Sequence, residues 1–89
     1  MKLRWKADKR KPGRQIVRLP AKKGAHGPCH AMISKADGDL FWSASCSINP
    51  DGSGFSYSRS GDAKTMAKAK SGAAADLRKV QDRVREHYR

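Results

Sequence analysis

Residues 29–48 read CHAMISKADGDLFWSASCSI, and this stretch decides the fold. Asp37-Gly38 lies between two strand-like runs, and this dipeptide favours the two-residue type I′ turn of a β-hairpin. The register set by this turn pairs the apolar residues of one face: Ile33 with Trp42, Ala31 with Ala44, and Cys29 with Cys46. The other face is mostly polar, and a shift of one residue would destroy this sorting. We therefore predict an antiparallel hairpin over residues 29–48.

The residues before the hairpin predict two more strands. Apolar and basic residues alternate over residues 3–7, which is the period of a half-buried strand. Gln15–Leu19 is a second apolar run, ended by a proline. Between the two runs, Pro12-Gly13 suits the centre of a type II turn. Residues 21–28 contain two glycines and a proline and are expected to form a flexible loop.

One further strand is predicted after the hairpin. Residues 49–52 read NPDG and suit a type I turn, because proline is pre-set for its first central position. Residues 55–59 alternate again, which predicts that Phe55 and Tyr57 face inward. Phe41 lies between serines on the polar face of the hairpin and is the aromatic residue expected to be exposed.

The last third of the chain predicts one amphipathic helix. Ser60 or Asp62 can cap a helix that begins near Ala63. At about 100° per residue, an apolar stripe is centred on Leu77. The members of this stripe are Ala63, Met66, Ala73, Ala74, Leu77, Val80, Val84 and Tyr88. Gly72 lies on the opposite side, where glycine costs roughly 1 kcal/mol relative to alanine.

Together these patterns predict an α+β fold, an antiparallel β-meander of four or five strands packed against one long C-terminal α-helix. The length of 89 residues allows one domain. Strands and basic loops are expected over residues 1–28, the meander over residues 29–59 and the helix over residues 60–89.

The charge of the chain points to a polyanionic partner. Twenty Lys and Arg residues against eight Asp and Glu residues give a formal net charge of +12. Residues 1–35 carry +10, residues 36–58 carry −3 and residues 59–89 carry +5. Lys and Arg neutralise the phosphates of DNA or RNA, so nucleic acid is the favoured partner. An acidic surface on a protein is the alternative partner, and solubility alone is the third explanation.

Other classes of protein are disfavoured. The chain has no run of about 20 apolar residues, so no membrane span is expected. Its N-terminus is not a signal peptide, which suggests the cytoplasm of a bacterial host. Eight acids and three histidines spread along the chain argue against an enzyme. We expect no catalytic residues, no cofactor, no metal and no small-molecule substrate.

The two cysteines have three possible roles. Cys29 and Cys46 are expected to face each other, and we favour packing in the core as free thiols. A cross-strand disulfide is geometrically possible, but the missing signal peptide favours a reducing compartment. A zinc site could draw on these cysteines with His26 and His30. Its spacing is poor, because Cys29 and His30 are adjacent and should point to opposite faces of a strand.

The candidate binding site is a set of phosphate contacts with little base readout. Five of the residues lie in the two N-terminal loops and two lie on the helix: Arg10, Lys11, Arg14, Lys22, Lys23, Lys64 and Lys68. The loops rank above the helix, because the exposed helix face mixes both signs of charge. Pairs such as Asp76–Lys79 and Asp82–Arg85 are expected there.

The order of turns and strands over residues 29–88 resembles known DNA-binding folds. Strand, Asp-Gly turn, strand, Asn-Pro-Asp-Gly turn, strand and an Ala/Lys-rich helix are similar to the arm-binding domain of tyrosine recombinases and to AP2-type domains. In that family the sheet enters the major groove of DNA. Here residues 42–58, where the sheet would meet DNA, contain no Lys or Arg.

Two other resemblances bear on function. Residues 61–74 resemble the last helix of double-stranded-RNA-binding domains, although that family has a helix before its sheet and this chain begins with strands. The whole chain is similar in style to small phage-encoded actinobacterial proteins, some of which bind host proteins. The leading expectation is therefore non-enzymatic nucleic-acid binding. The alternative is a small phage protein that binds and modulates an acidic host protein.

Overall fold

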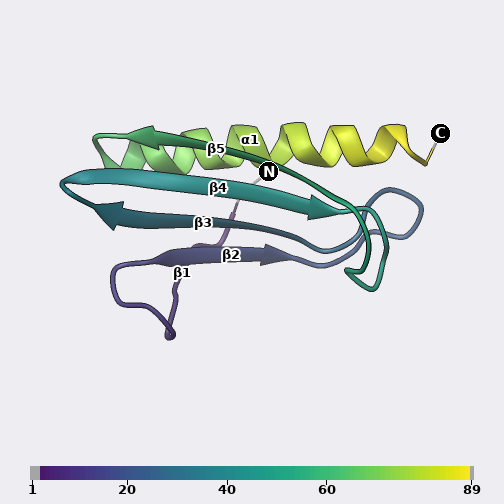
Figure 1. Cartoon of the computed structure of the whole chain (residues 1–89), viewed down its shortest axis with the longest axis horizontal. Coiled ribbons are helices and arrows are strands. Elements are labelled where there is room, and N and C mark those ends of the chain that lie inside the picture. Colours follow the sequence, from purple (N-terminus) through teal and green to yellow (C-terminus); the bar gives the residue numbers. More distant parts are fainter. Residues whose placement is uncertain (1–2, 89) are drawn as a thin grey trace.

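The structure is a computed structural model that describes residues 3–88. Five antiparallel strands form one sheet, each pairing with its neighbours in sequence, and one helix packs across a single face (Figure 1). The elements are β1 (Lys6–Ala7), β2 (Gln15–Leu19), β3 (Cys29–Ala36), β4 (Asp39–Ser47), β5 (Ser56–Ala63) and α1 (Met66–Glu86). This is the α+β meander with a C-terminal helix that the sequence predicts.

The β3–β4 hairpin has the predicted turn and register. Asp37 and Gly38 have φ angles of 50° and 83°, the positive values that a type I′ turn requires. Trp42 lies opposite Ile33, and Cys46 lies opposite Cys29. The two cysteines are buried in the core as expected, but they are joined by a disulfide and are not free thiols.

The core lies between the sheet and α1. Alternate strand residues point toward α1, and we call this side of the sheet the helix-side face and the other side the open face. Helix-side residues of β3, β4 and β5 pack against one side of the helix. The buried apolar residues are Val17, Cys29, Ala31, Ile33, Leu40, Ala44 and Cys46 from the sheet, and Ala69, Ala73, Leu77, Val80 and Val84 from α1. Four of these five helix residues belong to the predicted stripe.

The helix begins later than predicted, because the sheet takes up the expected start. Asp62 and Ala63 pair with Phe41 and Leu40 of β4, so β5 runs to Ala63 and the meander does not end at residue 59. Thr65 is the N-cap instead of Ser60 or Asp62, and its hydroxyl accepts a hydrogen bond from the backbone N–H of Lys68 at 3.2 Å. The backbone hydrogen bonds between β4 and β5 therefore outweigh the tendency of Ser60 and Asp62 to cap a helix.

The ends of the chain also differ from the prediction. The first strand covers only Lys6–Ala7, although Leu3 and Trp5 still pack partly buried against the core. At the other end Tyr88 is exposed and does not lie in the buried stripe; its hydroxyl donates to the carbonyl oxygen of Ile48.

Of the two aromatic side chains near β5 that were predicted to face inward, only Tyr57 does so. Phe55 is 61% exposed, so its inward placement was wrong, because β5 begins only after it. Its ring packs edge-on against Tyr57 with 5.0 Å between centroids, and Tyr57 is half-buried as expected. Phe41 is exposed on the open face, which confirms that prediction.

Two glycines make room for Trp42 between the sheet and the helix. A Cβ atom on Gly61 of β5 would lie 2.3 Å from Cζ2 of the Trp42 ring, and one on Gly72 of α1 would lie 2.5 Å from Cη2. Gly72 therefore faces the sheet, which corrects its predicted place on the far side of the helix. The indole ring is wide enough to reach a helix position well away from the centre of the stripe.

Asp76 ties the helix to this tryptophan. Its carboxylate accepts a hydrogen bond from Trp42 Nε1 at 2.9 Å and one from Arg59 Nε at 3.0 Å. The predicted partner of Asp76 was Lys79, whereas the predicted pair of Asp82 with Arg85 is present at 3.5 Å. Burial opposes ionisation of Asp76, but these hydrogen bonds and the positive charge of Arg59 outweigh it and hold its pKa below the ordinary value.

Asp76→Asn is expected to destabilise the fold by an amount that depends on pH. The folded state holds the pKa of Asp76 below the unfolded value of about 3.9, so its contribution is complete well above that value and is lost as pH falls through the folded pKa. The difference in unfolding free energy between wild type and variant should be about 1–3 kcal/mol at pH 7. It should shrink below about pH 4. Urea unfolding across this range measures it. Asp82→Asn on the exposed face is the control, and a difference for Asp76→Asn that stays constant with pH would contradict the assignment.

Candidate nucleic-acid interface

The loop between β1 and β2 is organised by Asp8. The carboxylate accepts hydrogen bonds from the backbone N–H of Arg10 at 2.9 Å and from Arg14 Nε at 2.6 Å. The hydrogen bond from Arg10 and the charge of Arg14 together lower the pKa of Asp8, although partial desolvation opposes them. The turn is completed by Gly13, whose φ of 80° fits the predicted type II geometry.

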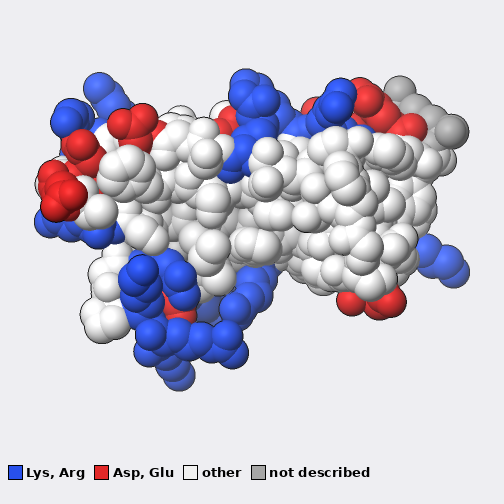
Figure 2. Space-filling view, viewed as in Figure 1, with Lys and Arg blue, Asp and Glu red and all other residues white. Residues whose placement is uncertain are grey.

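The three residues of the first loop that were predicted to contact phosphate differ in whether they form an ion pair. Arg14 forms an ion pair with Asp8 and holds the loop closed, so it is a structural residue here and not a free cation. Arg10 and Lys11 are exposed at the tip of the loop. In Figure 2 this loop lies within the large group of blue side chains at the lower left.

The second basic loop lies at the other end of the molecule. Lys22 and Lys23 are exposed in the connection between β2 and β3, where Lys22 bridges to His26 through the backbone. The two loops precede and follow β2, whose five residues span roughly 17 Å, and they project at opposite ends of it (Figure 1). The predicted N-terminal cluster is therefore two separate groups of cations.

The two predicted helix cations form a third group. Lys64 pairs with Asp39 at 2.6 Å, and the hydrogen bond and charge of Asp39 raise the pKa of Lys64. Lys68 is exposed in the first turn of α1. The start of α1 lies at the same end as the first loop, but acidic side chains lie at this end too (Figures 1 and 2). A polyanion would meet mixed charge here.

A groove along β1 and β2 lies between the two loops and was missed from the sequence. It encloses about 410 Å³ and is lined by Arg4, Lys6, Ile16, Val17, Arg18 and Leu19. Ile16 lies opposite Lys6 and Met32, and Arg18 lies opposite His30, so the long side chains of Lys6 and Arg18 rise from the open face. Within residues 3–88, neither these two side chains nor Arg4 forms an ion pair.

The signal for this groove was present in the sequence. The alternation over residues 3–7 puts Leu3 and Trp5 against the core and sends Arg4 and Lys6 the other way. Recognising the groove also required the pairing of β1 with β2, and that pairing depends on a short strand and a seven-residue loop. We use the name β1–β2 basic surface for Arg4, Lys6, Arg10, Lys11 and Arg18, none of which forms an ion pair among the described residues.

The open face beyond β2 is almost uncharged. In one row of cross-strand neighbours, Arg18 of β2 is succeeded by His30 of β3, Ser45 of β4 and Ser58 of β5. In the next row, Met32 of β3 is succeeded by Ser43 of β4 and Ser60 of β5. Partial burial and the neighbouring charge of Arg18 lower the pKa of His30, which favours its neutral form. The surface over β3 and β4 in Figure 2 is correspondingly white. This face offers hydroxyl groups but no cations.

A larger groove lies elsewhere and suits a polyanion less well. It encloses about 530 Å³ between β5 and α1, and the Arg83 guanidinium lies 5.1 Å from the centre of the Tyr57 ring inside it. Its charged lining residues are Arg59, Lys79, Asp82, Arg83 and Glu86. Arg59 is paired with the buried Asp76, and the two exposed acids would repel phosphate.

Two further findings bear on the class of protein. Among residues 3–88, no helix combines the length and the apolar composition that crossing a bilayer requires. Comparison of the chain with protein-family models, with curated proteins and with solved structures finds no match, so the site rests on the geometry described above.

Proposed function

We propose that this protein binds nucleic acid without catalysing a reaction, through phosphate contacts of the β1–β2 basic surface. The observation that carries the proposal is the groove in which Arg4, Lys6 and Arg18 stand together without an ion pair among the described residues. Only unpaired cations gain from phosphate, because a cation already held by a carboxylate must first give up that partner.

The dimensions of the surface suit a nucleic-acid backbone. β2 spans roughly 17 Å, which is the axial rise of about five nucleotides along one strand of a duplex. Lys22 and Lys23 lie beyond the far end of β2. The proposed contacts are made to phosphates, so binding should be insensitive to base sequence and sensitive to salt.

Removal of the groove cations should reduce the salt dependence of binding. The variant Arg4→Gln, Lys6→Gln, Arg18→Gln is expected to lower the slope of log affinity against log salt by about 0.9 for each phosphate that is no longer neutralised, up to about 2.7. Fluorescence titration of one labelled duplex at several salt concentrations measures the slope. Lys35→Gln, Arg78→Gln, Lys79→Gln is the matched control, because it removes the same charge from exposed positions outside the surface.

The outcomes separate the proposal from its alternatives. An unchanged slope in the groove variant would refute the proposal. Docking of the sheet, as in recombinase arm-binding domains, predicts instead that Ser43→Ala with Ser45→Ala reduces affinity and sequence preference. Binding to an acidic host protein predicts equal, small reductions of duplex affinity in the groove variant and its control, since both carry the same net charge.

A further inference from the structure

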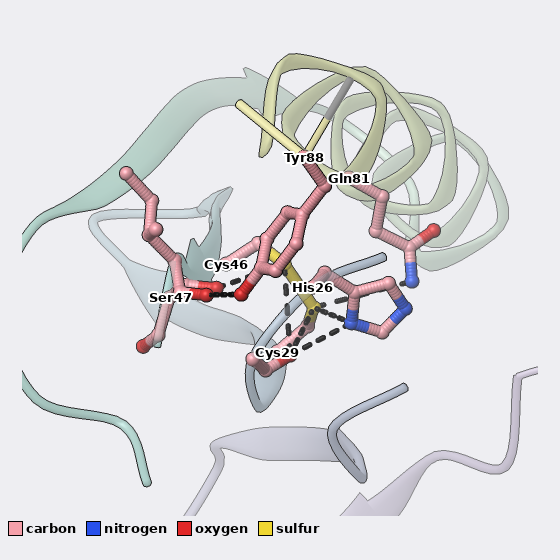
Figure 3. The surroundings of a disulfide bond; sticks show 8 residues. His26, Cys29, Cys46, Ser47, Gln81 and Tyr88 are labelled. Carbon is pink, nitrogen blue, oxygen red and sulfur yellow. Dashed lines mark hydrogen bonds between the residues drawn. A yellow bond between two sulfur atoms is a disulfide. The ribbon is translucent and has the colours of Figure 1, made fainter. Parts of the chain in front are cut away.

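Three side chains of metal-binding type converge at the end of the sheet where the loop after β2 meets β4. His26, Cys29 and Cys46 are all buried, and their ligand atoms lie within 4.8 Å of one another (Figure 3). The β3–β4 register supplies both sulfur atoms on the helix-side face. His30, considered with them on sequence grounds, lies on the open face and does not join them.

The loop after β2 is built to place His26. Gly27 donates a backbone hydrogen bond to the Ser47 carbonyl at 2.8 Å, and Ser47 donates one to the Pro28 carbonyl at 3.0 Å. A Cβ atom at Gly27 would lie 2.1 Å from the Asn49 carbonyl oxygen, so only glycine allows this approach. The loop is thereby held against the end of β4, with the imidazole directed at the sulfur atoms.

The surroundings of the sulfur atoms are more polar than a disulfide needs. Nδ1 of His26 lies 2.7 Å from the Gly27 carbonyl oxygen and 3.4 Å from Cys29 Sγ, and the buried Gln81 of α1 places Nε2 at 4.0 Å from the same sulfur. A disulfide is uncharged and gains little from such donors in a core. A thiolate gains a great deal, because burial of an unpartnered charge is costly. The two buried polar residues can therefore partner a reduced pair of cysteines, which lose their protons when a metal binds.

We propose that the reduced protein binds one Zn²⁺ ion through Cys29 Sγ, Cys46 Sγ and the imidazole of His26. Zinc prefers thiolate and imidazole ligands, and its bond lengths place neighbouring sulfur and nitrogen ligands about 3.5 Å apart. The observed separation of His26 Nδ1 and Cys29 Sγ is 3.4 Å. The carbonyl oxygen of Gly27 is also close, at 3.4 Å from Cys29 Sγ, 3.9 Å from Cys46 Sγ and 2.7 Å from His26 Nδ1, and its contact with Nδ1 must lengthen when Zn²⁺ binds.

The disulfide and the zinc site are alternative states of the same two sulfur atoms. Two molecules of a thiol reductant supply two electrons and two protons, which break the Cys29–Cys46 bond and leave two thiols and the oxidised reductant. Zn²⁺ then displaces one proton from each thiol. Because metal binding releases protons from its ligands, zinc affinity should fall at acid pH.

Zinc titration of reduced and oxidised wild-type protein tests the proposal. Reduced protein, with two thiols counted by a thiol reagent, is expected to retain one Zn²⁺ per chain after gel filtration. Co²⁺ in its place should give thiolate-to-metal charge-transfer absorption. The oxidised protein has the same sequence and no thiols, and it should retain none. This comparison does not depend on a substitution that could prevent folding.

A pair of histidine variants tests the third ligand. His26→Gln is expected to weaken zinc binding by more than about 100-fold, since even residues that only orient ligands contribute about 10- to 100-fold. His30→Gln, four residues away on the open face, should bind like the wild type. The proposal is overturned if reduced protein retains no zinc, if oxidised protein retains as much, or if His26→Gln binds as tightly as His30→Gln.

Discussion

Leu77→Ala is expected to lower the free energy of unfolding by about 2–5 kcal/mol. Leu77 is fully buried in α1 against the sheet and is among the largest side chains of the core. Truncation removes its apolar packing and leaves a cavity that the fixed ladders of β3 and β4 cannot collapse to fill. A domain of this length has a small margin of stability, so the reduction should be a large share of the total.

Urea unfolding of Leu77→Ala and Lys79→Ala side by side measures this effect. Lys79 is two residues away and exposed, so Lys79→Ala should change the unfolding free energy by less than about 0.5 kcal/mol. The two changes shorten long side chains on the same helix, one of them buried and the other exposed. Equal effects would mean that the buried side of α1 has been assigned wrongly.

Gly72→Ala is expected to destabilise the fold, opposite to the usual effect of this substitution in a helix. In an exposed helix position, alanine in place of glycine stabilises by about 1 kcal/mol. Here the added methyl carbon would lie 2.5 Å from Trp42 Cη2, with a second ring atom at 2.6 Å. The ring is held by its hydrogen bond to Asp76, so the helix must move away from the sheet. Overpacking of this kind costs about 1–3 kcal/mol.

A double-variant cycle isolates the contact with the tryptophan. In a Trp42→Leu background the ring is gone, and Gly72→Ala should become neutral or stabilising, as helix propensity predicts. Thermal or urea unfolding of the four proteins gives the coupling. Ser71→Ala is the matched control, because Ser71 is the exposed neighbour of Gly72. A stabilising Gly72→Ala in the wild-type background would contradict the close packing described above.

The hairpin could be predicted because its information is local. Asp37-Gly38 demands positive φ angles that few other dipeptides accept, and the alternation on both sides fixes the register around them. The extent of β5 could not be predicted in this way. Its residues from Ser60 to Ala63 have little strand propensity, and they are extended because β4 offers them a complete ladder. For the same reason, α1 begins at Met66 and not near Ala63 as predicted.

The candidate site shows a similar division between local and distant information. The excess of positive charge in the first third is visible by counting. The sequence cannot show that Arg14 forms an ion pair with Asp8, or that β2 separates the two basic loops. It also cannot show that the pairing of the short β1 with β2 brings Arg4 and Lys6 beside Arg18. Helix periodicity likewise predicted that Leu77 is buried but did not predict that Gly72 faces the sheet. A helical-wheel projection gives only the angle of each residue around the helix and takes no account of how far the large Trp42 ring extends from the sheet.

The meander order has a kinetic consequence for the two cysteines. Each strand pairs with the strand next to it in the chain, so the sheet can assemble hairpin by hairpin without a long loop closure. Cys29 and Cys46 are only 17 residues apart and meet when the β3–β4 hairpin closes. α1 is the last element of the chain, and it covers the sulfur atoms only when it docks. We therefore expect the chemical state of the two cysteines to be decided during folding, while the hairpin is still uncovered.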